Sequence, residues 1–137
     1  MYHYISTKVC KASDIGVNNN LFGGTMISWL DEAAASLASS LCCSPNLITL
    51  KIDSVLFKKA VHVRDHIRIY GKLTSIGRSS VSLEVEARRF NFCEASEELV
   101  CSTNMTFVNV DANGKSFPIN GQLRSRLQKE IDQNISL

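Results

Sequence analysis

Asp31 is the acidic residue whose position best suits chemistry. Apolar residues recur at three- and four-residue steps from Thr25 to Leu41, which predicts a helix, and Asp31 falls at the flank of its apolar stripe. A carboxylate at such a flank is half desolvated, and it can act as a general base or as a nucleophile. The neighbouring Glu32 points away from the stripe and is predicted to be a solvated acid. Helix position alone is equally compatible with an ion pair or a loop cap formed by Asp31.

The start of this helix, at Gly23 and Gly24, offers complementary chemistry. The backbone N–H groups of Gly23, Gly24 and Thr25 should have no acceptor within the first turn, and the helix dipole adds about half a positive charge at that end. We expect these donors to stabilise an oxyanion that forms on a bound carbonyl group. A tight turn that only packs the helix against a sheet is the alternative interpretation.

Histidine and metal chemistry have little support. His3, His62 and His66 lie outside any recognisable nucleophile motif, and we interpret His62 and His66 as surface or dimer-contact residues. The spacing of His, Asp and Glu is not that of metal ligands, so we expect no metal site and no required cofactor.

Two basic segments are candidates for binding an anionic group. Lys58 and Lys59 follow one predicted strand, and Arg78, Ser79 and Ser80 follow a short glycine-containing turn. A guanidinium binds phosphate through its planar fork, and serine hydroxyls add hydrogen bonds. Each segment alone is also typical of a solvated surface.

Alternating apolar residues predict a short strand before the helix and four long strands after it, near residues 48–57, 67–73, 81–87 and 99–110. A one-residue change of phase near Asp53 and Ser54 predicts a bulge. The order indicates an α+β fold, in which one helix packs on one curved, mainly antiparallel sheet. Because such a sheet leaves its edges open, we expect at least a homodimer.

Composition indicates one compact domain in residues 1–120 of the 137-residue chain. Residues 121–137 are predicted to form a surface helix or a flexible tail, because the stripe of Leu123, Leu127 and Ile131 is too narrow for a core. The net charge of +2 is spread along the chain, which argues against nucleic-acid binding.

The cysteines and the apolar segments predict where the protein works. No secretory segment and no run of about 18 apolar residues occurs, so we expect a cytoplasmic protein outside the membrane. The five cysteines lack the spacing of zinc sites and are predicted to be free, buried thiols.

Several segments together resemble the hotdog-fold acyl-CoA hydrolases of the YciA and brain acyl-CoA hydrolase type. The similarity runs in order and spacing through residues 5–120 and is carried by 18–24 (NNNLFGG), 26–33 (MISWLDEA), 57–65 (FKKAVHVRD), 69–72 (IYGK), 76–80 (IGRSS), 105–111 (MTFVNVD) and 113–115 (NGK). This resemblance implies a long central helix wrapped by five to six strands. It also implies hydrolysis of acyl-CoA to a free acid and CoA, so that CoA is part of the substrate and of the product.

The resemblance also implies roles for particular residues. Asp31 corresponds to the catalytic carboxylate of the family, and Gly23 and Gly24 to the helix start that polarises the thioester carbonyl. Phe22 and Thr25 are then expected to contact the substrate. The basic segments 58–59 and 78–80 resemble places where CoA binds. The family assembles as homodimers with active sites between subunits, and often as hexamers that are trimers of dimers.

Three positions depart from the family pattern. Gly16 stands where many members have an asparagine that assists the reaction, and Asn18 is the nearest substitute. Ala60 and Arg64 replace a proline and a glycine. A non-catalytic acyl-CoA-binding or regulatory module therefore remains an alternative. A 3-hydroxyacyl-thioester dehydratase is a weaker one, because no histidine stands near Gly23 or on the helix.

Overall fold

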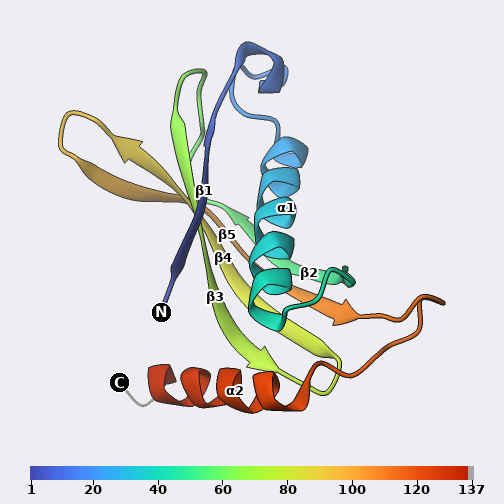
Figure 1. The fold of residues 1–137 in the computed structure, drawn as a ribbon. Coiled ribbons are helices and arrows are strands. Elements are labelled where there is room, and N and C mark those ends of the chain that lie inside the picture. The colour runs from blue at the N-terminus through green and yellow to red at the C-terminus, as the bar shows by residue number, and fades with distance from the viewer. Residues whose placement is uncertain (136–137) are drawn as a thin grey trace.

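The structure is a computed structural model and describes residues 1–135. A long helix, α1, lies against one face of a strongly twisted sheet, and a second helix, α2, lies beside β3 and the end of α1 (Figure 1). In chain order, the strands and helices are β1 (His3–Val9), the 3-10 turn η1 (Ala12–Asp14), α1 (Gly23–Cys42), β2 (Leu47–Phe57), β3 (His66–Ile76), β4 (Ser80–Asn91), β5 (Ser96–Asn109) and α2 (Gly121–Ile135).

The sheet has five strands in the order β1-β3-β4-β5-β2, and every pairing is antiparallel. The predicted α+β layout of one helix on an antiparallel sheet is confirmed. Because β2 crosses over to pair with β5, it becomes one edge of the sheet, and β1 becomes the other.

Small and apolar side chains let α1 pack closely on the sheet. The helix contains no glycine or proline after its first two residues, and it ends where Cys43 adopts a left-handed conformation, with φ 48°. Gly71 of β3 lies under the helix, where an added Cβ would stand 2.7 Å from the side chain of Leu37. The helix buries Met26, Leu30, Ala33, Ala34, Ala38 and Cys42.

Alternate residues of the three central strands complete the core, as their period of two predicted. The fully buried side chains on this face include Ile67, Ile69, Leu83, Val85, Met105 and Phe107.

Five cysteines are free, but only Cys10, Cys42 and Cys101 are buried. Burial raises the pKa of the Cys101 thiol to about 11. The prediction of buried thiols is therefore wrong for Cys43 and Cys93, which are exposed on a helix cap and a hairpin.

β2 is an irregular edge strand. Its pairing with β5 shifts register between Thr49 and Lys51 and again between Asp53 and Leu56, and Ser54 has a left-handed φ of 55°. The predicted bulge at Asp53 and Ser54 is thereby confirmed. The strand leaves large apolar side chains exposed, namely Ile48, Leu50, Ile52, Leu56 and Phe57.

The C-terminal helix contributes more to the core than its sequence suggested. We expected its apolar stripe to be too narrow for a core, yet Leu127 and Ile131 are only 3% and 4% exposed. The stripe suffices because α2 fills the gap beside β3 and the end of α1 rather than covering a whole layer. Residues 136–137 of the predicted tail lie outside the described residues. None of the described helices is long and apolar enough to cross a membrane.

Leu127→Ala tests this packing. Removing a buried leucine side chain leaves a cavity, so we expect the free energy of unfolding to fall by about 2–4 kcal/mol. Urea denaturation at one fixed protein concentration measures the change. The exposed Lys129→Ala on the same helix is the control and should change stability by less than about 0.5 kcal/mol. Equal stability of the two variants would show that α2 is only loosely attached.

Candidate active site

The helix start, residues Phe22–Thr25, presents two free backbone donors. Phe22 is extended, with φ −64° and ψ 131°, and its carbonyl accepts hydrogen bonds from the N–H groups of Thr25 and Met26 at 3.0 and 3.2 Å. Thr25 is therefore not a free donor, which corrects the sequence prediction. Within the described chain, the N–H groups of Gly23 and Gly24 have no acceptor. Both donors lie at the positive end of the helix dipole.

Two neighbouring segments hold the helix start in place. The N–H of Phe22 donates to Asp14 at 3.0 Å, and the N–H of Leu21 donates to the carbonyl of Val61 at 2.7 Å. The ring of Phe22 covers Gly24, because a Cβ added to Gly24 would lie 2.7 Å from that ring. Glycine at position 24 thus allows the ring to lie this close to the helix.

The loop before the helix start contains Gly16 and Asn18. It is closed by an isolated bridge between Ile15 and Leu21 and by a 2.8 Å hydrogen bond from the N–H of Gly16 to Asn20. Asn18 is exposed in this loop, and no hydrogen bond of its side chain occurs among residues 1–135. The structure therefore gives Asn18 no visible link to the helix start. A Cβ added to Gly16 would meet the ring of Phe22 at 3.5 Å, an ordinary contact, so a side chain fits there.

A cavity of about 340 Å³ opens beside the helix start. One wall is formed by residues on either side of the helix start, together with Gly23. The other is formed by residues 57–61, which are the end of β2 and the first part of the β2–β3 connection (residues 58–65). The cavity thus brings together three residues that the sequence had singled out, Gly23, Lys58 and Lys59. Met26, Phe57 and Val61 supply much of its apolar lining.

The two lysines of this cavity differ in their pairing. The Nζ of Lys59 donates to Glu98 at 3.0 Å, so its charge is already neutralised by a carboxylate. Lys58 forms no ion pair with any described residue. An anionic ligand would therefore meet the free charge of Lys58, and Lys59 is less suited to the binding role predicted for it.

Asp31 is half-buried on the side of α1 that faces β2. Its Oδ1 accepts a 2.7 Å hydrogen bond from the hydroxyl of Thr49, and no cation pairs with it in the part of the chain that the structure describes. The ion pair that helix position alone had left open is therefore not formed. Glu32, by contrast, is exposed and lies 3.9 Å from the Nζ of Lys8.

Thr49 was not identified from the sequence. The alternation of the strand shows that the Thr49 side chain points to one face of the sheet. It does not show that α1 places Asp31 beside Thr49. Only the packing of α1 against β2 reveals that a hydroxyl donor fixes the orientation of the carboxylate.

One chain does not bring Asp31 to the helix start. Asp31 follows Gly24 by seven residues, which is about 10 Å along a helix that rises 1.5 Å per residue. A single carbonyl group cannot lie within about 3 Å of both. Asp31 lies instead beside the free edge of the sheet, where β2 has no partner strand.

The second basic segment lies at the other end of α1 (Figure 1). The carbonyl of Ser79 accepts a hydrogen bond from the N–H of Asn109. The side-chain oxygen of Asn109 in turn accepts one from the hydroxyl of Ser44, which lies just after α1. The carbonyl of Ser80 accepts from Gly77 within the turn. Arg78 borders a cavity of about 460 Å³ together with Arg124 and Lys129 of α2. Within one subunit, the predicted binding residues thus form two separate groups.

A family model and curated relatives agree on where this chain belongs. The model described as Thioesterase superfamily matches residues 18–91. YkhA of Bacillus subtilis, named an uncharacterized acyl-CoA thioester hydrolase, is 30% identical over 136 residues, covering 96% of this chain and 76% of YkhA. The chain belongs to the thioesterase superfamily. An uncharacterized acyl-CoA thioester hydrolase of Haemophilus influenzae is 33% identical to this thioesterase over 122 residues, 87% of this chain and 79% of that protein.

Solved structures share the whole fold of this thioesterase. HI0827, described as a hexameric broad specificity acyl-coenzyme A thioesterase and solved as an aspartate-to-alanine mutant, has a TM-score of 0.86 at 27% identity, covering 96% of this chain and 98% of that one. Cj0915, a hexameric hotdog fold thioesterase of Campylobacter jejuni, has a TM-score of 0.79 at 32% identity, covering 92% and 96%. The predicted hotdog fold and thioesterase family are therefore confirmed.

Proposed function

We propose that this thioesterase hydrolyses acyl-CoA to a free acid and CoA, with Asp31 as its catalytic carboxylate. The observation that carries the proposal is the state of Asp31, which is half-buried, free of any cationic partner in residues 1–135 and oriented by Thr49. A carboxylate held in this way is available to remove a proton or to attack a carbonyl carbon. The names of the relatives, acyl-CoA thioester hydrolases, support the substrate class.

The proposed active site is shared between two subunits. The similar solved structures are described as hexameric, and β2 offers a free edge with exposed apolar side chains. Antiparallel pairing of two β2 strands creates a two-fold axis. If the axis passes near Ile27 and Ser28, halfway between Gly24 and Asp31, then Asp31 of one subunit comes level with Gly24 of the partner subunit. Such a dimer is the building block of the hexamer, a trimer of dimers, that we propose.

Two chemical routes fit this arrangement. In one, Asp31 takes a proton from water while the water oxygen adds to the thioester carbon. In the other, the carboxylate adds to that carbon itself, and water later hydrolyses the resulting anhydride. In both routes the N–H groups of Gly23 and Gly24 stabilise the oxyanion, and the C–S bond then breaks to release the CoA thiolate, which takes up a proton. No cofactor is required.

The charged part of CoA is proposed to bind at the two basic segments. Lys58, which forms no ion pair with a described residue, lies beside the helix start, whereas Arg78 lies beyond the far end of α1. Both side chains can bind phosphate groups, because arginine forms bidentate contacts and lysine acts as a point charge.

We also propose that the protein is cytoplasmic. The support is that all five cysteines are free thiols.

The second candidate is a non-catalytic acyl-CoA-binding module, which Gly16 favours because an asparagine is expected at that position. It differs from the enzyme in one measurable respect: it binds CoA and releases no free thiol from any acyl-CoA.

Asp31→Asn tests the catalytic role of the carboxylate. The amide keeps the shape but cannot serve as a base or nucleophile, so turnover should fall by about 100-fold or more. Glu32→Gln, the same change one residue along the helix, should leave turnover within about twofold, because Glu32 is exposed.

The rate is measured as release of free thiol from short, medium, long and aromatic acyl-CoAs. A protein-only blank is needed because Cys43 and Cys93 are exposed. Full activity of Asp31→Asn would contradict the proposal.

Gly23→Pro removes one proposed oxyanion donor and should leave the helix backbone in place. Proline is favoured at the first helical residue, Phe22 already has the extended conformation that precedes proline, and the N–H of Gly23 has no acceptor to lose. Turnover should fall by about 100-fold. Gly121→Pro, at the first residue of α2, is the matched control and should retain activity. Unchanged turnover in Gly23→Pro would remove Gly23 from the mechanism.

Mixing these two variants tests whether subunits share the site. A heterodimer of Asp31→Asn and Gly23→Pro contains one site with both residues intact, provided that Asp31 and the helix start come from different subunits. Co-expression in equal amounts should therefore recover about a quarter of wild-type activity. If each subunit held a complete site, the mixture would show no recovery above either parent.

A further inference from the structure

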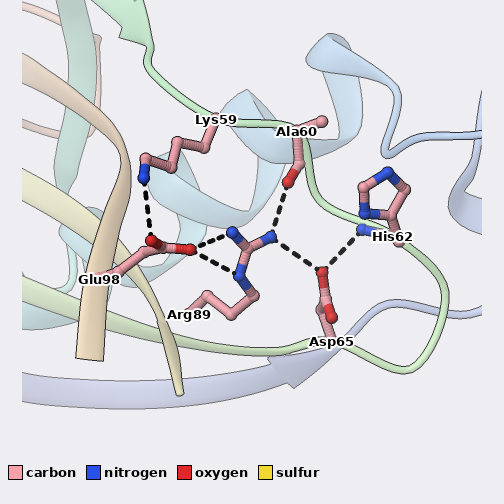
Figure 2. A network of polar contacts seen from close by, with 6 residues as sticks. All are labelled: Lys59, Ala60, His62, Asp65, Arg89 and Glu98. Atoms are coloured by element: carbon pink, nitrogen blue, oxygen red, sulfur yellow. Dashed lines mark hydrogen bonds and ion pairs between the residues drawn. The ribbon is translucent and has the colours of Figure 1, made fainter. Parts of the chain in front are cut away.

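Arg89 is the centre of a polar network that joins β4, β5 and the β2–β3 connection (Figure 2). It lies on β4 opposite Glu98 of β5, and its Nε and Nη2 both donate to one carboxylate oxygen of Glu98. Its Nη1 donates to the carbonyl of Ala60 at 2.7 Å and to Asp65 at 3.2 Å. One guanidinium therefore ties two central strands to two points of the β2–β3 connection.

The acceptors of Arg89 make further contacts within the same connection. The carboxylate of Asp65 also accepts the N–H of His62 at 2.8 Å, and Glu98 also accepts Lys59 (Figure 2). Hydrogen bonds from Arg89 and Lys59 lower the pKa of the Glu98 carboxyl, so Glu98 remains an anion near neutral pH. Two cations thus balance two carboxylates, and removing Arg89 leaves both carboxylates with less compensation.

The connection held by Arg89 is the segment that supports the helix start. The carbonyl of Val61, next to Ala60, accepts the N–H of Leu21 at 2.7 Å, and Leu21 directly precedes Phe22. The same connection forms one wall of the cavity at Gly23 and carries Lys58. A chain of hydrogen bonds therefore runs from Arg89 through the connection to the residue before the helix start.

The connection also contains a residue in an unfavourable backbone conformation. Arg64 has a φ of 80°, in the left-handed region that favours glycine. Such a conformation persists only where the surroundings enforce it. The N–H of Arg64 donates to the carbonyl of Cys10 at 2.7 Å, and the N–H of Cys10 donates to the carbonyl of Asp65. The carboxylate of Asp65 accepts from Arg89. The connection therefore depends on its tertiary contacts to keep its shape.

We propose that Arg89 is a positioning residue of the active site, which holds the β2–β3 connection against the helix start and so aims the N–H groups of Gly23 and Gly24. The inference rests on the proposed function. Arg89 itself does not line the cavity and makes no proposed contact with the substrate. Arginine suits this role because its planar fork donates in three directions at once, which lysine cannot reproduce.

Arg89→Gln and Arg88→Gln form a matched pair of variants. Arg88 is the preceding residue of β4, on the opposite face of the sheet, where it pairs with Glu86 and Glu97 away from the cavity. Both variants lose a partly buried guanidinium that joins two strands. A purely structural role for Arg89 would therefore make the two variants behave alike.

The experiment compares kcat and KM for acyl-CoA hydrolysis, alongside the melting temperature. Arg89→Gln should lower kcat by about 10- to 100-fold, with a KM change of less than about threefold, because misaimed donors lose stabilisation of the transition state. Arg88→Gln should keep kcat within about twofold, whatever its melting temperature. Arg89→Lys keeps the charge but loses the fork, and it should recover only part of kcat. A wild-type kcat in Arg89→Gln would overturn the proposal.

Hydrogen exchange separates this proposal from the proposed function. Arg89→Gln should raise amide exchange at Leu21, whose N–H donates to the connection, and at Arg64, whose N–H lies in the connection and donates to Cys10. Arg88→Gln should leave both amides protected. This readout needs no activity, so it holds even if the wild-type protein hydrolyses no acyl-CoA. Unchanged protection of Leu21 in a folded Arg89→Gln or Arg89→Lys would overturn the positioning role.

Discussion

A straight helix keeps Asp31 and the helix start about 10 Å apart along its axis, and the proposed chemistry depends on this spacing. The carboxylate and the N–H groups of Gly23 and Gly24 must both reach one thioester carbonyl, yet neither can move along α1 toward the other. A second copy of the helix, running in the opposite direction, removes the difficulty. The free apolar edge of β2 lies on the same side of α1 as Asp31, which is where such a copy would need to attach.

The close packing of α1 fixes the height of Asp31 above the sheet. Small side chains on the buried face of the helix and Gly71 beneath it allow helix and sheet to approach closely. Thr49 of the edge strand then lies within hydrogen-bond distance of Asp31. The carboxylate is thus oriented by the same edge strand that is proposed to form the dimer, so orientation and assembly are linked.

The groups around the helix start are divided between support and chemistry. Lys59, Asp65, Glu98 and Arg89 pair with one another, so their charges are used to hold the β2–β3 connection. Lys58 and the donors of Gly23 and Gly24 have no such partners among the described residues and stay available for a ligand. The ion pairs that hold the connection therefore leave Lys58 and the N–H groups of Gly23 and Gly24 without partners in the described chain.

Much of this protein was determined by the sequence itself. Helical and alternating periodicities predicted α1, the antiparallel strands and the bulge of β2, because these patterns reflect which side chains each local structure can bury. The motif around Gly23, Gly24 and Asp31 predicted the family. The N–H of Thr25 donates to the carbonyl of Phe22, a local bond of the first helical turn that periodicity does not show. Tertiary structure alone decided that Lys59 pairs with Glu98 and that Cys43 and Cys93 are exposed. It also brought Thr49 to Asp31 and Arg89 to Ala60, and it buried Leu127. Periodicity cannot show such contacts, because partners far apart in sequence meet only through the relative placement of whole strands and helices.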